Sequence, residues 1–506
     1  MKKIVLLPLD ERPCNYQFPY DMFNNEEINI VRPDLSILSD KKRIGDLKAL
    51  SNFLIEESKD ADGLVVAIDT LLYGGIVPSR LHHDSRETFL ERLNVLKTIK
   101  ENNKNIKIYA FHLIMRSPQY SSDDEEPDYY AHYGREIFLK GFLSHKHELG
   151  LASEDEINHL NSLVIDESAL NDFLGRREIN TDMVISSLEL LDNKVIDFLI
   201  IPQDDAAEFG WTAKDQSKVR SVIENKNLQL SAYMYPGADE VANSLLSKMV
   251  LNFKNKKPLI YIYYPSYTSG MLIPRYEDRM LDTTVKYQIL GAGGLVASSI
   301  SEADLVLFVN APSGEMEEAA NQHKNFRQYQ IQRNLVEFVE KIRYVSKDLN
   351  KPAIIADVAF ANGGDIELVK MLEKSGLLME VAAYAGWNTS SNTIGTAIPH
   401  GISTWLNGKT TQLQSFLALR YIEDVGYCSI VRSDVGNNKL DEYNYNYFYV
   451  EEQRGIVSKI VKEALENFVK TYLPSIKNKV KITDIYMPWR RMFEVGLTVE
   501  YKNGEK

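Results

Sequence analysis

Short, nearly continuous apolar runs that alternate with helix-like segments are the feature of this sequence that most restricts its fold. The runs are rich in Val, Ile, Leu and Tyr, and each is followed by polar or turn-forming residues. Strands covered by helices on both faces have this character, because neither face of such a strand meets water. The alternation therefore predicts βαβ units and an α/β fold class.

Ten of these runs are predicted to be strands. They are Lys3–Leu9, Ile28–Val31 (the weakest), Gly63–Ile68, Ile106–Leu113, Val195–Ile201, Leu228–Tyr235, Leu259–Tyr263, Asp304–Val309, Ala353–Ala356 and Met379–Ala383. This number exceeds the eight strands of one barrel, so two architectures stay open. We expect the first eight to close a (β/α)8-barrel-like parallel core. The alternative is a pair of open, doubly wound α/β domains.

The strand–helix rhythm fades after about Gln412, which sets the expected domain boundaries. The segment near Met492–Tyr501 is predicted to be an antiparallel strand. We therefore expect a catalytic core over residues 1–411, with a division near residue 255 in the two-domain alternative, and a small C-terminal α+β addition over residues 412–506.

Composition excludes several functional classes. The net charge of -13 disfavours a nucleic-acid-binding surface, which needs basic patches. No apolar run reaches the length of a membrane span, and the apolar start of the chain meets charged residues too early for a signal peptide. With only two cysteines, a disulfide framework is excluded and a reducing cytoplasm is expected. No phosphate- or dinucleotide-binding motif is present, so we expect no cofactor, and the sequence leaves open whether a homo-oligomer forms.

Polar clusters follow nearly every predicted strand. The candidate site residues are Asp10, Glu11, Arg12, Asp69, Tyr73, His112, Arg116, Asp204, Asp205, Trp211, Asp239, Glu240, Asn310, Asp357, Trp387, Asn388 and Asn392. The carboxyl ends of parallel strands lie on one side of an α/β fold, where ligands bind. These side chains are therefore predicted to line a shared pocket, over which the acidic segment Ser117–Tyr133 forms a long surface loop that could act as a lid.

The adjacent aspartates Asp204 and Asp205 are the candidate catalytic pair. Two neighbouring carboxylates cannot both be buried and ionised at low cost, so one pKa is expected to rise. A protonated carboxyl beside an ionised one suits general acid/base chemistry. The alternative is a structural turn in which each carboxylate is solvated or caps the following segment.

Each other cluster also has a structural alternative. Asp10 and Arg12 could form an ion pair, and His112 could be a hydrogen-bonded core residue. Asp69, Asp239 and Glu240 could cap helices. The segment around Trp387 carries amide and hydroxyl side chains that suit a polyhydroxylated ligand, although a turn network would also use them.

Several segments resemble a known family. "PLDERPCN", "DTLLYGGIVPSR", "IPQDDAAEFGW", "YPGADE" and "AGWNTSSNTIG" are similar to the hallmark blocks of DUF4127, a bacterial family of unknown function, over most of the chain. At the level of fold, the chain also resembles the O-GlcNAcase-like hexosaminidases, although the flanking sequence differs. That resemblance implies that Asp204 polarises the substrate's acetamido group and that Asp205 is the general acid.

Three functions from different classes follow from these patterns. The first is a glycoside hydrolase that acts on a small carbohydrate, with Asp204 and Asp205 as the acid/base and stabilising pair and tryptophans as sugar platforms. The second is a metal-dependent hydrolase or isomerase, for which Asp10, Asp69, His112, Asp204, Asp239 and His400 could supply oxygen and nitrogen ligands. The third is a sugar-binding protein without catalytic activity.

Overall fold

The computed structural model describes residues 1–502 and has a mixed α/β fold with two separate parallel sheets. The predicted α/β class and parallel strands are thereby confirmed. The chain divides into two compact units, which are treated one at a time here. Unit 1 contains Met1–Glu11, Asn24–Leu245 and Tyr276–Asp278, and unit 2 contains Arg12–Phe23, Leu246–Arg275 and the chain from Arg279 onward.

The sheet of unit 1 has six parallel strands. They are β1 (Lys2–Leu7), β2 (Ile28–Val31), β3 (Gly63–Ala67), β4 (Lys107–Phe111), β5 (Phe198–Gln203) and β6 (Ala232–Pro236). Every residue of β3 and β5 is buried, as their continuous apolar sequences predict. The order is β2-β1-β3-β4-β5-β6, so the winding direction reverses between β1 and β3, as in doubly wound folds.

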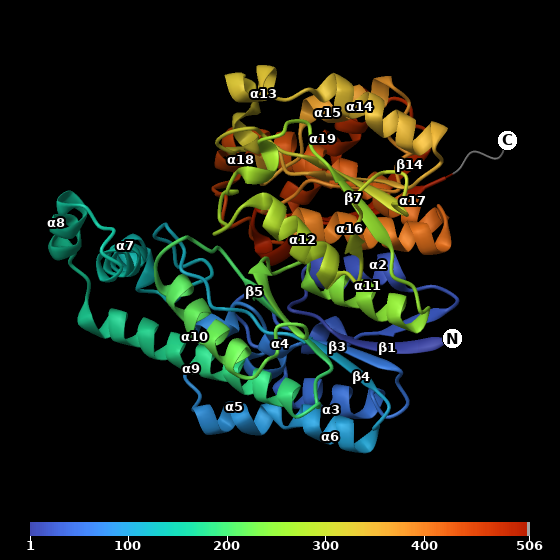
Figure 1. Ribbon diagram of the computed structural model, residues 1–506. Coiled ribbons are helices and arrows are strands. Elements are labelled where there is room, and N and C mark those ends of the chain that lie inside the picture. The colour runs from blue at the N-terminus through green and yellow to red at the C-terminus, as the bar shows by residue number, and fades with distance from the viewer. Residues whose placement is uncertain (503–506) are drawn as a thin grey trace. The chain divides into compact units, whose positions relative to one another are not determined.

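The helices of unit 1 connect and cover these strands. They are α3 (Leu47–Glu57), α4 (Ile68–Tyr73), α5 (Arg86–Leu93), α6 (Val95–Asn102), α7 (Tyr130–Glu148), α8 (Glu154–Ser162), α9 (Glu167–Asp192) and α10 (Trp211–Asn225). Side-chain caps fix several starts: Asp46, Ser85 and Asp166 each accept a hydrogen bond from a backbone N–H in the first turn. Helices α3, α5 and α6 pack as neighbours on one face of the sheet (Figure 1).

The sheet of unit 2 has five parallel strands. They are β7 (Leu259–Tyr263), β8 (Leu295–Val296), β9 (Leu305–Asn310), β11 (Ala353–Asp357) and β13 (Ala383–Ala385). Their order is β13-β11-β9-β7-β8. Counted from β7, this is the same doubly wound order as the first five strands of unit 1. Two smaller pairs complete the strands: β10 (Glu317–Glu318) with β12 (Phe360–Ala361), and β14 (Val480–Tyr486) with β15 (Gly496–Tyr501).

The helices of unit 2 include one that is buried along most of its length. They are α1 (Pro13–Tyr16), α2 (Phe18–Phe23), α12 (Leu281–Gly291), α13 (Arg327–Ile331), α14 (Leu335–Arg343), α15 (Ile366–Lys374), α16 (Ser390–Asn407), α17 (Thr411–Arg420), α18 (Arg432–Asn438) and α19 (Ile456–Tyr472). The buried helix α16 packs on β11 and β13, with α12 beside it, and α14 and α15 pack together on the other face (Figure 1). A π-helical segment, Tyr421–Val431, joins α17 to α18. Helix α11 (Val241–Phe253) spans the boundary between the two units.

The closed (β/α)8 barrel expected for the core is not observed among residues 1–502. A barrel needs each new strand to add on the same side of the previous one, whereas β3 pairs with β1 on the side opposite to β2. This reversal leaves β2 and β6 at the two ends of the strand order. The strands divide into two sheets between β6 and β7, on either side of residues 255–257.

The C-terminal strand and the membrane prediction can be compared directly with the structure. The predicted antiparallel strand near Met492–Tyr501 is β15, which pairs antiparallel with β14. None of the helices formed by residues 1–502 has both the length and the apolar composition of a membrane span.

Candidate functional site

The predicted site residues fall into two sets, one in each unit. In unit 1, strand ends or the turns that follow them carry Asp10, Glu11, Asp69, His112, Arg116, Asp204, Asp205, Asp239 and Glu240. Because β1, β3, β4, β5 and β6 are parallel, their carboxyl ends lie along one edge of the sheet. This edge is the candidate functional site.

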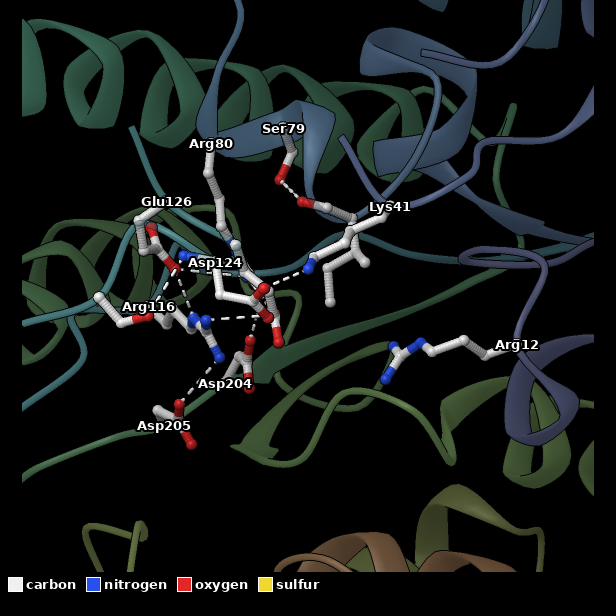
Figure 2. A network of polar contacts seen from close by, with 12 residues as sticks. Arg12, Lys41, Ser79, Arg80, Arg116, Asp124, Glu126, Asp204 and Asp205 are labelled. Carbon is white, nitrogen blue, oxygen red and sulfur yellow. Dashed lines mark hydrogen bonds and ion pairs between the residues drawn. The ribbon is translucent and has the colours of Figure 1, made fainter. Parts of the chain in front are cut away.

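Two buried arginines, Arg80 and Arg116, organise this edge (Figure 2). Arg80 ends the short 3-10 helix Pro78–Arg80, and Arg116 lies just beyond β4. Arg80 Nη2 donates a hydrogen bond to Asp204 Oδ2 at 2.9 Å, and Arg116 Nη1 donates to Asp205 Oδ2 at 3.1 Å. Each aspartate of the adjacent pair therefore has a guanidinium of its own.

The acidic loop between β4 and α7 also binds both arginines. Glu125 Oε2 lies 2.9 Å from Arg80 Nη1 and 3.2 Å from Arg116 Nη2. Arg116 Nε donates to Glu126 Oε1 at 2.8 Å, and Arg80 Nη1 lies 3.4 Å from the same oxygen. The Glu126 side chain is only 1% exposed. Four carboxylates thus surround two guanidiniums, and the loop predicted to cover the site is anchored on them.

A left-handed turn directs the two aspartates to different arginines. The strand β5 ends at Gln203, and Asp205 has φ 41, a conformation that aspartate adopts more readily than most residues. The side chains of Asp204 and Asp205 remain 18% and 22% exposed. Both carboxylates can therefore reach a ligand while they are held in ion pairs.

The environment of the pair favours the protonated form of one carboxyl. Burial raises the pKa of Asp204 to about 6, and the charge of Asp205 adds to the rise, whereas Arg116 and Arg80 oppose it. Burial also raises the pKa of Asp205 against the same two arginines. A carboxyl that titrates near pH 6 can hold and release a proton close to neutral pH.

Asp69 lies in a more deeply buried position at the same edge. Its Oδ2 accepts a hydrogen bond from the backbone N–H of Leu113 at 3.0 Å, so the side chain bridges the ends of β3 and β4. Burial raises the pKa of Asp69 to about 7. The Tyr73 hydroxyl and His112 Nε2 are buried without a hydrogen-bond partner among the described residues. Burial also lowers the pKa of His112 to about 3, so this imidazole is neutral.

Glu11, which follows β1, and Lys41 make further polar contacts at this edge. Glu11 accepts hydrogen bonds from Ser39 Oγ at 2.7 Å and from the backbone N–H of Lys41 at 3.2 Å. The Lys41 ammonium pairs with Asp124 of the acidic loop (Figure 2). Asp10, by contrast, is completely buried.

The acidic pair after β6 has two different environments. Glu240 is completely buried, and its Oε2 accepts a hydrogen bond from the backbone N–H of Ala238 at 2.9 Å, which is the local capping interaction allowed by the sequence. A Cβ atom on Gly237 would lie 1.9 Å from Glu240 Oε1, and φ is 139 there, so glycine is required. Asp239 contributes to the raised pKa of Asp204, after burial and Asp205.

Trp211, the candidate sugar platform of unit 1, is engaged in helix packing. Its indole N–H donates to the carbonyl of Ile137 at 2.9 Å, and its ring packs against a core cluster that includes Tyr130 and Phe173. A Cβ atom on Gly141 would come within 2.3 Å of the indole nitrogen. The ring therefore fits closely between α7 and α10.

In unit 2, the strand-end residues Asn310 and Asp357 form a saturated network. Asn310 Nδ2 donates to Asp357 Oδ1 at 2.8 Å, and Tyr384 Oη and the backbone N–H of Asp365 donate to Asp357 Oδ2 at 2.6 and 2.7 Å. Burial, followed by the charge of Asp365, raises the pKa of Asp357 to about 7. Arg333 Nη1 completes the network at Asn310 Oδ1 and Asp365 Oδ2, at 2.9 and 2.8 Å.

The remaining candidates of unit 2 lie near the start of α16 and near Trp489. Trp387 is 7% exposed, and its indole N–H donates to Thr396 Oγ1 at 3.2 Å. Asn392 Nδ2 donates to Thr389 Oγ1 at 3.0 Å, and Asn388 has φ 54. The guanidinium of Arg12 lies 4.3 Å from the centre of the Trp489 ring and is ion-paired with Glu494 at 3.8 Å.

The metal-ligand set considered in the sequence analysis can also be located. His400 lies in unit 2, where its Nε2 is 3.3 Å from the carbonyl of Leu413, whereas the five other residues of that set lie in unit 1. Within residues 1–502, no group of three or more His, Cys, Asp or Glu side chains is placed to hold a metal ion.

The comparison with known families agrees with the sequence blocks quoted above. Residues 4–498 match the family model described as "Protein of unknown function (DUF4127)". The chain belongs to the DUF4127 family. No curated protein matches its sequence.

The site of this DUF4127 chain contains five charged residues that were not among the sequence candidates: Lys41, Arg80, Asp124, Glu125 and Glu126. Arg80 belongs to the block "DTLLYGGIVPSR", but it lies eleven positions beyond Asp69 and past a glycine pair, so its direction could not be inferred. The sequence predicts the acidic loop as a possible lid, but it does not single out any of its carboxylates as a site residue. Its run of four acidic residues, Asp123–Glu126, is the available signal, because any of these carboxylates that is buried needs a cation nearby.

Proposed function

We propose that this DUF4127 chain is a glycoside hydrolase that acts on a small oligosaccharide or glycoside, with Asp204 as the general acid and Asp205 as the stabilising carboxylate. The observation that carries the proposal is the environment of Asp204. Its carboxyl is partly exposed, ion-paired with Arg80 and adjacent to Asp205, and burial raises its pKa to about 6.

The chemistry requires only these groups and water. The proton of Asp204 goes to the glycosidic oxygen as the C–O bond to the anomeric carbon breaks, so that the leaving group departs as an alcohol. Asp205, as a carboxylate, stabilises the positive charge that develops on the sugar ring. Water supplies the hydroxyl of the new reducing end, and its other proton restores the acid on Asp204.

The two arginines have a positioning role in this scheme. Arg80 and Arg116 fix the direction of the two carboxylates, and their charges keep the pKa of Asp204 from rising further. In this scheme each arginine acts through the carboxylate that it contacts and not on the substrate itself. Its loss should therefore change the pH dependence of the reaction as well as its rate.

The roles of the two aspartates are distinguished by the leaving group of the substrate. A general acid matters most when the leaving alcohol is weakly acidic, because an acidic leaving group departs without a proton. If Asp204 is the acid, Asp204→Asn should lower turnover of an alkyl glycoside by about 100-fold or more and should retain most activity on the 2,4-dinitrophenyl glycoside. The reverse assignment, implied by the resemblance to the hexosaminidases, predicts this pattern for Asp205→Asn.

A matched variant controls for the loss of an ion pair. Asp197, at the opposite end of β5, pairs with Lys100 and Lys107, and its side chain is 22% exposed, as is that of Asp205. Asp197→Asn should leave turnover unchanged. Unchanged turnover of the alkyl glycoside in both site variants would exclude the proposed roles.

A second candidate is a hydrolase or isomerase that uses a divalent metal ion. The sequence leaves this candidate open, although residues 1–502 bring no three His, Cys, Asp or Glu side chains together in an arrangement that could hold a metal ion. Metal analysis of protein purified without chelator or affinity tag tests this candidate, and stoichiometric zinc or manganese would favour it over the first. Binding of a sugar without turnover would instead favour the non-catalytic alternative.

The proposal includes the compartment. Cys14 and Cys428 are both buried and are not joined in a disulfide, which suits a protein of the reducing cytoplasm.

A further inference from the structure

Unit 2 contains a pocket of about 490 Å3 beside the carboxyl ends of β9 and β11. Its walls come from the 3-10 helix Ala319–Lys324, from α13 and from the first turn of α15. The volume falls within the range of small-molecule sites. Ligands of doubly wound sheets bind at this edge of the strands.

The guanidinium of Arg333 lines this pocket, and its side chain is 1% exposed. Its Nη1 donates to Asn310 and Asp365, and its Nε donates to the carbonyl of Tyr329 at 3.3 Å. The hydrogen bonds among the described residues leave Nη2 without an acceptor. A buried guanidinium thus retains two unused N–H donors, both on Nη2, at the pocket.

The two neighbouring carboxylates are already engaged by three donors each. Asp365 accepts from Arg333, from Asn310 and from the backbone N–H of Glu367, the last at 3.0 Å. Both oxygens of Asp357 accept hydrogen bonds as well. At the buried wall of the pocket, the unengaged donors therefore carry the positive charge of Arg333, and their complement is an oxyanion.

Aromatic rings form the apolar part of the pocket. Tyr329 and Phe360 are stacked with ring centres 4.3 Å apart and planes 6° from parallel. Phe326, which is only partly buried, packs against this cluster. At the rim, Lys370 adds a positive charge and Glu367 a negative one, and both are exposed.

From this arrangement we propose that unit 2 binds a small molecule that carries an oxyanion, a carboxylate or a phosphate monoester, on an apolar ring. The oxyanion accepts a hydrogen bond from Arg333 Nη2, and the ring packs against Phe326. This site is separate from the Asp204 site and does not depend on the proposed hydrolase activity.

Titration calorimetry on the full chain tests the site with phenyl phosphate, inorganic phosphate and benzoate at constant ionic strength. We expect phenyl phosphate or benzoate to bind with one-to-one stoichiometry. The ring should make phenyl phosphate bind about fivefold or more tightly than inorganic phosphate, because it removes apolar surface from water. The ratio of phenyl phosphate to benzoate affinity then identifies which oxyanion the site prefers. Failure of both aromatic probes to bind would overturn the proposal.

Three variants assign the binding to this pocket. Arg333→Gln should weaken the aromatic probe about tenfold or more, as expected for loss of a charge-assisted hydrogen bond. Phe326→Ala, at a partly buried position, should abolish the preference for phenyl phosphate over inorganic phosphate. Arg343→Gln, on the outer helix α14, is the matched control and should bind as the unmodified chain does.

Circular dichroism of each variant reports whether it is folded. If Arg333→Gln does not fold, Phe326→Ala and Lys370→Gln carry the test, since neither side chain is fully buried. Unchanged binding of the aromatic probe in a folded Arg333→Gln variant or, where that variant does not fold, in both Phe326→Ala and Lys370→Gln would overturn the proposal.

Discussion

Arg80 donates a hydrogen bond to Asp204 at 2.9 Å across 124 positions of the sequence, and both residues lie at the carboxyl edge of the six-stranded sheet. The arginine comes from the turn after α4, and the aspartate directly follows β5. This contact links the catalytic candidate to the loop carboxylates, because the same guanidinium binds Glu125 and Glu126.

Arg80→Gln should destabilise the chain and raise the pKa of Asp204 further. Removal of one partner from a buried ion-pair network typically costs about 3–5 kcal/mol of unfolding free energy. The comparison is Lys226→Gln, whose ion pair with Asp192 is more exposed and should contribute less than about 1 kcal/mol. Urea denaturation measures both, and equal losses would contradict the buried role of Arg80.

Glu126→Gln should destabilise the chain more than Glu125→Gln. Both glutamates bind Arg80 and Arg116, but their side chains are 1% and 16% exposed. Water can compensate for a lost charge only at the more exposed position. Urea denaturation of the two variants under the same conditions gives the comparison, and a larger loss for Glu125→Gln would show that the loop is anchored differently.

Asp69→Asn should change how stability depends on pH. Burial raises the pKa of Asp69 from 3.8 to about 7, so the folded state binds this proton more tightly than the unfolded state. This contribution to stability is complete below about pH 4 and is lost as the pH rises towards 7. The amide introduced by the substitution does not titrate. The unfolding free energy of the variant should therefore rise relative to that of the wild type by up to about 4 kcal/mol over that pH interval. Unfolding free energies at pH 5 and pH 8 test the sign of the effect.

The proposed hydrolase should lose activity as the pH rises above about 6, because Asp204 must be protonated and its pKa is about 6. Asp205 helps to raise that pKa, so Asp205→Asn should move the fall in kcat/KM to lower pH. The measurement is kcat/KM of the Asp205→Asn variant, obtained from its residual activity across the pH range. If the fall in kcat/KM stays in place, Asp204 does not titrate as the acid.

Tyr384→Phe should cost more stability than Tyr421→Phe at pH 8. Both hydroxyls are buried, but Tyr384 donates to the carboxylate of Asp357 at 2.6 Å and Tyr421 donates to the carbonyl of Leu378 at 3.0 Å. Hydrogen bonds to charged groups contribute about 1.5–3 kcal/mol, and neutral ones about 1 kcal/mol. Thermal unfolding of both variants tests the ranking, which would fail if the losses were equal.

Most of the apolar runs coincide with strands, because burial on both faces leaves a local signal, but the predicted strand Met379–Ala383 shares only Ala383 with β13, and Leu228–Tyr235 begins four residues before β6. Ile28–Val31 and Leu259–Tyr263 are strands with the expected bounds, and the doublet Asp204–Asp205 does follow β5. Strand order carries no local signal, since the position of β3 beside β1 depends on the path of the intervening chain. The apolar runs alone therefore could not exclude the single barrel that was expected.

The same limit applies to individual side chains of the site. Trp211 and Trp387 both follow strands, as expected of site residues, yet their indole N–H groups are used by Ile137 and Thr396. Whether an aromatic ring points to solvent or into packing is set by residues distant in the sequence. Arg80 was missed for a similar reason, because its partners come from later segments.

The assignment of α1 and α2 to unit 2 has a consequence for biosynthesis. Met22 in this segment is synthesised 381 residues before Ser403, whose Oγ donates a hydrogen bond to the Met22 carbonyl. At ordinary rates of translation this interval lasts roughly 20–80 s. During that time nascent α1 and α2 lack their partners in α16 and α17, and a chaperone that recognises apolar segments would find Phe18 and Phe23 accessible. A gene cut near residue 255 would separate these helices from their unit permanently.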